Sequence, residues 1–117
     1  MADADVAALR VRLTAACALE PWGEAAAVAV LLAFEPIASR REFARHVGRG
    51  GVQWDKAVTG PAWSTGERFL IATAAGLWGG RRYGADVYLV PLLDDEFYAV
   101  WLAMVTASRT GKVPGDG

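Results

Sequence analysis

Side chains that could carry out acid–base or metal chemistry are few in this sequence. General acid–base catalysis and metal binding usually require histidine, cysteine or clustered carboxylates, and the chain has one histidine, His46, and one cysteine, Cys17. Asp94, Asp95 and Glu96 are adjacent, but consecutive helical residues point in different directions, so their carboxylates do not converge on one cation. Helix capping explains them better. We expect no catalytic residue, no metal ion and no cofactor.

Two further features leave an enzymatic alternative open without favouring it. His46 follows Arg45 near the expected end of a helix, where the helix dipole favours a solvated histidine; catalysis would need it, or a carboxylate, to act without a visible partner. Ser64-Thr65-Gly66 precedes another helix, whose free N–H groups could hold an anion. That segment lacks the glycine spacing and the lysine of a phosphate-binding loop, so we interpret it as a cap.

A basic cluster in the middle of the chain is the first candidate for binding. The formal net charge is −1, but residues 36–60 contain five basic and two acidic side chains. Arg40 and Arg41 fall in the expected first turn of a helix, where the dipole disfavours cations by some tenths of a kcal/mol. We expect a contact surface for a partner or for nucleic acid, the alternative being a solvated face. Its expected members are Arg40, Arg41, Arg45, Arg49, Arg81 and Arg82.

The five tryptophans are the second candidate for binding, because tryptophan is frequent at the centres of protein interfaces. Trp22, Trp78 and Trp101 fall in or beside strongly apolar patterns. Trp54 and Trp63 instead flank a Gly-Pro turn, where side chains are usually exposed. We therefore expect Trp54 and Trp63 to contribute to a partner-binding surface, the alternative being that they cover the edge of the core.

Helical periodicity defines the first half of the chain. Apolar residues at helical spacing predict a helix over residues 4–19, ended by Glu20-Pro21. Residues 23–34 are apolar on nearly every face, which is typical of the central helix of a bundle. Ser39 and Glu42 have the spacing of a capping box and predict a short third helix that ends at Gly48.

The second half is predicted to hold two more helices. Residues 52–58 fit either a turn of helix or a short extended segment. Ser64 and Glu67 form a second capping box, which opens a helix that Gly79-Gly80 ends. Residues 87–93 favour a short helix or turn, and Asp94 caps a last helix that runs to about Arg109.

These elements predict an all-α domain, a compact bundle of four or five helices with short loops. We expect one domain over residues 1–109 and a flexible tail over residues 110–117. An acidic N-terminus, a single cysteine and the lack of an apolar run of about 20 residues indicate a cytoplasmic protein outside the membrane.

The expected function is a non-enzymatic adaptor or assembly module that binds a protein partner or a second copy of itself. Nucleic-acid binding through the Arg40–Arg49 face is the alternative. No motif in the sequence supports assignment to a known family. The sequence therefore does not identify the partner or the oligomeric state.

Overall fold

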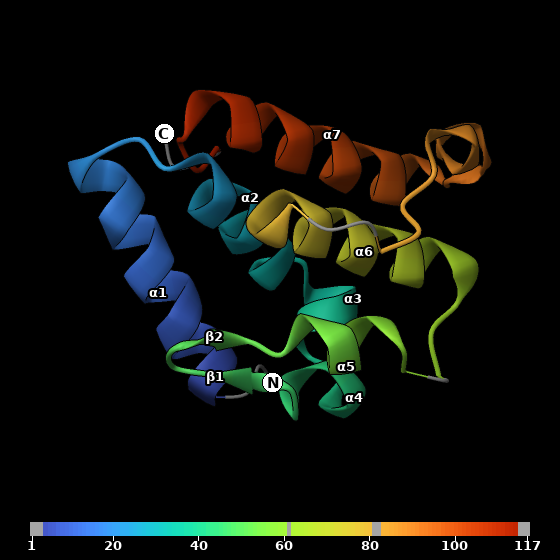
Figure 1. Ribbon diagram of the computed structural model, residues 1–117, viewed down its shortest axis with the longest axis horizontal. Coiled ribbons are helices and arrows are strands. Elements are labelled where there is room, and N and C mark those ends of the chain that lie inside the picture. The colour runs from blue at the N-terminus through green and yellow to red at the C-terminus, as the bar shows by residue number, and fades with distance from the viewer. Residues whose placement is uncertain (1–3, 61, 81–82, 115–117) are drawn as a thin grey trace.

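The computed structural model describes residues 4–60, 62–80 and 83–114. Four long helices form the body of the molecule, and α7 lies along its upper edge in Figure 1. They are α1 (Ala4–Leu19), α2 (Gly23–Leu32), α6 (Thr65–Gly79) and α7 (Asp95–Thr110). The predicted all-α class is confirmed, and the first helix has the predicted bounds.

Helix α2 is the centre of the fold. Its alanines from Ala25 to Ala29, together with Leu31 and Leu32, are buried, so almost every side of the helix is covered. Helices α1, α6 and α7 all pack against it (Figure 1). Small alanine side chains permit this close approach on several sides. Cys17 of α1 is buried in the same core as a small apolar side chain.

A layer of short elements lies between α2 and α6 in the sequence and at the lower edge of Figure 1. Strands β1 and β2 pair antiparallel, with Val47 opposite Val52. The undecided residues 52–58 therefore contain both a strand end and a helix turn. The layer consists of α3 (Glu35–Ala38), α4 (Arg41–Ala44), β1 (Val47–Gly48), β2 (Gly51–Val52) and α5 (Trp54–Val58).

The predicted capping box at Ser39 is wrong. Pro36 lies in the first turn of α3, so a helix has already begun before Ser39 is reached. Ser39 ends α3, and its hydroxyl donates to the Glu35 carbonyl oxygen at 2.6 Å. Arg40 is extended between α3 and α4 and takes the N-cap position without a side-chain hydrogen bond to the helix. Of the single helix predicted from Ser39 to Gly48, only α4 is helical, and the last two residues of that predicted helix form β1. The helix α3 lies before the predicted start.

The predicted second helix ends at Leu32, before the expected residue 34, and Glu35-Pro36 begins α3 instead of only ending α2. The predicted ends at Ser64, Gly79-Gly80 and Asp94 are confirmed. Ser64 accepts from the Glu67 N–H, and the Glu67 carboxylate accepts from the Ser64 N–H, which completes the capping box. Gly80 ends α6 with a φ of 70°. Asp94 accepts from the Phe97 N–H at the start of α7. Before α7, η1 (Val87–Leu92) is a short 3₁₀ helix, as favoured.

The described chain stays packed beyond the expected boundary at residue 109. Gly111 is buried, and its carbonyl oxygen accepts from the Trp22 N–H at 3.0 Å. Val113 packs partly against the core. Residues 110–113 therefore belong to the packed domain, because the end of α7 contacts the turn between α1 and α2.

Two glycines with nearly the same positive φ, Gly80 and Gly111, test how tightly the end of α7 packs against the turn between α1 and α2. Gly111 has a φ of 72°, and a Cβ there would lie 2.7 Å from both the Pro21 Cβ and the Trp22 nitrogen. Gly80 has a φ of 70° but open space around a Cβ. We expect Gly80→Ala to lower the free energy of unfolding by about 1 kcal/mol and Gly111→Ala by about 3 kcal/mol, because overpacking is added.

Urea unfolding followed by circular dichroism measures both changes. Equal losses of unfolding free energy in the two variants would contradict tight packing around Gly111. Both variants place an alanine at a positive φ, but only Gly111→Ala adds a steric clash.

Candidate functional site

Arg40 points into the structure rather than to solvent. Its Nη1 donates to the Glu67 carboxylate at 2.7 Å, and its guanidinium lies 4.8 Å from the centre of the Trp63 ring. A charge-assisted hydrogen bond and a cation–π contact together hold the side chain against the start of α6. Arg40 is therefore engaged in contacts within the chain and is not a free member of the basic surface that the sequence predicts.

Trp54 and Trp63 are buried, which corrects the expectation that they are exposed. Their exposed fractions are 8% and 6%, and the Trp63 Nε1 donates to the Ala57 carbonyl oxygen at 2.7 Å. The position directly before the N-cap Ser64 could suggest a hydrophobic staple, but the residue four positions after the cap is Arg68, which is not an apolar partner. No local pattern therefore predicts the burial of Trp63. Neither indole offers a docking surface in this conformation.

The remaining arginines of the cluster stay on the surface around the β1–β2 hairpin. Arg41, Arg45 and Arg49 are exposed, and the Arg49 Nε lies 3.6 Å from the Asp5 carboxylate. The hairpin and α4 border a shallow hollow of about 500 Å³ beside Arg45 and Trp78. Arg81 and Arg82, the other expected members, lie outside the described residues.

His46, the only histidine of the sequence, lies at this hollow. Its pKa is lowered below the ordinary 6.5, first by partial burial and then by the positive charges of Arg45 and Lys56. Burial alone lowers the pKa of a histidine, so the shift does not measure the local charge. The two nearby cationic side chains are what would attract an anion.

Most of the large apolar side chains that are exposed lie elsewhere, on η1 and α7. Of the eight large apolar side chains that are exposed among the described residues, five belong to these two elements. Trp101 and Val105 of α7 are half-buried beside them, and Tyr98 stacks on Trp101 with ring centres 6.2 Å apart. We call this the C-terminal apolar surface. Its members are Val87, Tyr88, Leu92, Tyr98, Trp101, Leu102 and Val105.

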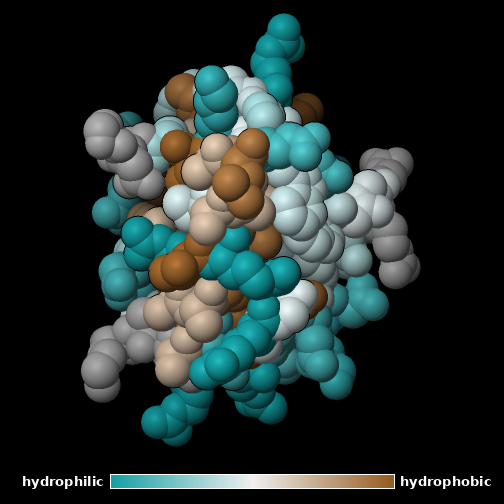
Figure 2. Space-filling model, turned by 90° about the vertical axis from the view of Figure 1, so that its left-hand side faces the viewer, coloured by the Kyte–Doolittle hydropathy of each residue, from teal (hydrophilic) through white to brown (hydrophobic). Residues whose placement is uncertain are grey.

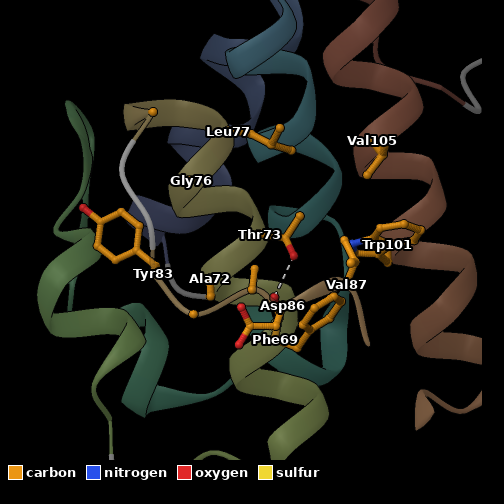
Figure 3. Close-up of a pocket in the computed structure, with 13 residues that line it drawn as sticks. Phe69, Ala72, Thr73, Gly76, Leu77, Tyr83, Asp86, Val87, Trp101 and Val105 are labelled. Atoms are coloured by element: carbon orange, nitrogen blue, oxygen red, sulfur yellow. Dashed lines mark hydrogen bonds between the residues drawn. The ribbon is translucent and has the colours of Figure 1, made fainter. Parts of the chain in front are cut away.

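A groove of about 360 Å³ between α6 and α7 borders the C-terminal apolar surface. Figure 3 shows Tyr83 on one side of the groove, Trp101 and Val105 on the other, and Thr73 between them. The Thr73 hydroxyl is engaged, because it donates to the Phe69 carbonyl oxygen at 2.8 Å. The groove therefore presents mainly apolar and aromatic walls.

A second apolar strip lies on the side of the molecule that Figure 2 faces, where apolar side chains gather between hydrophilic ones. A groove of about 580 Å³ runs between α1, α2 and the end of the described chain. Val11, Val30 and Val113 line it together with several alanines. None of the described residues that line it is aromatic, whereas the C-terminal apolar surface includes Tyr88, Tyr98 and Trp101. Aromatic side chains contribute most to interfaces.

Neither a cluster of metal-ligating side chains nor a membrane-spanning helix is found in the part of the chain that the structure describes. No three His, Cys, Asp or Glu side chains of those residues could share a metal ion. No helix of residues 4–114, gaps excepted, is both long and apolar enough to cross a membrane.

Comparison with known proteins finds no family model, no curated protein and no solved structure that matches this chain. Functional inference therefore depends on the surfaces described above.

The Glu67 carboxylate gives a prediction for the hydrogen-bonded cluster around Arg40. Burial raises the pKa of Glu67, but hydrogen bonds from the Ser64 N–H, Arg40 and the Ser64 hydroxyl outweigh burial, so the pKa lies below its ordinary 4.5. Its stabilising effect is therefore present above pH 4.5 and decreases as the pH falls through the lowered pKa. We expect Glu67→Gln to lower the free energy of unfolding by about 2 kcal/mol at neutral pH.

Urea unfolding at a series of pH values checks this expectation, with the exposed Glu20→Gln as control. The gap between wild type and Glu67→Gln should narrow below pH 4.5. A gap that stays constant with pH would contradict the role of the ionised carboxylate.

Proposed function

We propose that this chain is a non-enzymatic protein–protein interaction module that binds a second copy of itself through the C-terminal apolar surface. Contiguous apolar patches on small domains commonly mark interaction sites. This chain buries other large side chains, Trp54 and Trp63 included, yet Val87 is 76%, Tyr88 71% and Leu92 75% exposed. This exposure carries the proposal.

The composition of the surface also supports self-association. Tyr98 and Trp101 form a stacked pair at its edge, and aromatic residues contribute strongly to binding because they bury a large area and keep a polar group. Homodimers usually form twofold interfaces in which one patch meets its own copy. A cytoplasmic location fits the single, buried Cys17, which forms no disulfide within the chain.

Replacing one exposed leucine with glutamate tests the surface. We expect the wild type to have about twice the 12.4 kDa mass of one chain in light scattering. Leu102→Glu should give the monomer mass without loss of stability, because Leu102 is 46% exposed in the single chain and a charge at an interface centre is desolvated on pairing. Leu19→Glu on α1, where the leucine is 90% exposed, should leave the dimer intact.

A wild-type monomer at all concentrations would contradict self-association. A dimer that Leu19→Glu disrupts, and Leu102→Glu does not, would move the interface to the strip beside α1.

A second candidate function, nucleic-acid binding, is favoured by the cationic side chains Arg45 and Lys56 near His46. Exposed Arg41, Arg45 and Arg49 surround the hairpin, and arginine is well suited to bind phosphate. Two acidic side chains partly neutralise the positive charge of this surface. Glu67 binds Arg40, and Asp5 lies next to Arg49. We therefore rank this candidate below self-association.

Charge reversal at the hairpin tests the second candidate. Fluorescence anisotropy with short single- and double-stranded DNA and RNA should show binding at low salt that weakens as salt rises. Arg45→Glu combined with Arg49→Glu should weaken it at least about tenfold and reduce the salt slope by about two. Arg10→Glu combined with Lys112→Glu changes the charge equally at exposed positions elsewhere, so it should bind as the wild type does. Absence of binding at low salt would reject this function.

A further inference from the structure

We propose that two copies of the chain pair through α7 in an antiparallel arrangement, with the twofold axis passing beside Leu102. This inference deepens the proposed function and depends on it, because it specifies the geometry of the same interface. It is carried by the outward side of α7, which combines a regular stripe of exposed residues with opposite charges at its two ends.

The outward stripe of α7 has the spacing of a helix-pairing seam. Five exposed residues follow one another at intervals of four, three, four and three, the heptad pattern that keeps one face of a helix towards a partner. The buried Met104 and Ala107 lie on the inward side, against the core. The stripe consists of Asp95, Ala99, Leu102, Thr106 and Arg109.

Side-chain size favours a close approach at the middle of the stripe. Leu102 is its one large apolar side chain, with Ala99 and Thr106 on either side. Small neighbours around a central leucine leave room for the leucine of a second helix at the usual spacing of about 8–10 Å between helix axes. Tyr98 and Val105 both lie along the edge of the stripe that faces the groove beside α6 and cover that edge.

The charges at the two ends decide the direction of pairing. Asp95 lies seven residues before Leu102 and Arg109 seven residues after it, which is about 10.5 Å in each direction along the helix. A twofold axis beside Leu102 therefore places Asp95 of each copy opposite Arg109 of the other. A parallel pair would instead bring the two Asp95 carboxylates together and the two arginines together, which repels.

The same arrangement uses the remaining exposed apolar residues. Helix η1 leads directly into the start of α7, at the right-hand end of α7 in Figure 1. In an antiparallel pair the end of the second α7 lies beside this start, and so beside Tyr88 and Leu92 of η1. The surface thereby extends beyond the helix pair at both ends, symmetrically.

Disulfide trapping in the full-length protein tests the geometry. Single cysteine variants Leu102→Cys, Thr106→Cys and Leu19→Cys are incubated at low concentration with oxidised glutathione and analysed on non-reducing gels. Leu102→Cys should form a covalent dimer, because the two positions meet at the axis within disulfide reach. Thr106→Cys should not, because its two copies are displaced by about 12 Å along the helix. The exposed Leu19→Cys and the buried Cys17 of the wild type control for random collision.

Each outcome separates this inference from the proposed function. Trapping at both Leu102→Cys and Thr106→Cys indicates a parallel pair and overturns the inference while self-association stands. A dimer by light scattering that Leu102→Cys does not trap places the interface elsewhere and also overturns the inference alone. A monomer under all conditions overturns both.

Charge reversal gives a second, independent readout. Asp95→Arg and Arg109→Asp should each raise the dimer dissociation constant by roughly tenfold, since two symmetric attractions become repulsions. The double variant should return to within about threefold of the wild type. Each single change also places a charge that the dipole of α7 disfavours, and these two destabilising effects add in the double variant. Recovery of the dimer in the double variant can therefore come only from the restored charge pairs between the two copies. A double variant as weak as the singles overturns the inference.

Discussion

The fold depends on covering one short helix on all sides. Helix α2 has almost no polar side chain to turn towards water, so every side of it must be buried by another element. Three long helices supply that cover, and each presents to α2 the apolar stripe of its own inner side. Alanine at four of the five positions from Ala25 to Ala29 makes the arrangement possible, because larger side chains would keep the surrounding helices apart.

This central position of α2 explains why α7 has two different sides. Its inner side, with Met104 and Ala107, packs towards α2 and the core. Its outer side lies at the edge of the molecule, where no element of the described chain covers Leu102. A helix at the edge needs only one apolar stripe for folding, so an apolar residue in a second stripe calls for a different explanation. Pairing with another copy supplies one.

Local sequence signals predicted the long elements well, and long-range packing decided the rest. Ser64 and Glu67 form the capping box that their spacing predicts, whereas Ser39 and Glu42, with the same spacing, do not. The difference lies upstream, where Pro36 has already started a helix that includes Ser39. A four-residue pattern cannot show what precedes it. The all-α class was predictable because helix periodicity and end signals are local.

The candidate surface was less predictable than the fold. Trp54 and Trp63 were expected at the surface because their neighbours are turn residues, but Trp63 donates to Ala57 and lies under Arg40. Contacts of this kind join residues whose proximity no local pattern encodes. The exposure of Leu102 had a usable signal, since it falls outside the apolar face formed by Phe97, Val100, Met104 and their neighbours.

The link between Arg40 and Glu67 also bears on how the molecule opens. It spans 27 residues and fastens the layer of short elements to the first turn of α6, through a carboxylate whose side chain is only 13% exposed. Separating that layer would leave a poorly solvated charge without its partner, which is costly. Short helices and a two-residue hairpin would ordinarily fluctuate independently of a helical core. Here the ion pair adds to Ile37, Phe43 and Trp54, which the layer buries in the common core. We therefore expect the layer and the core to open as one cooperative unit.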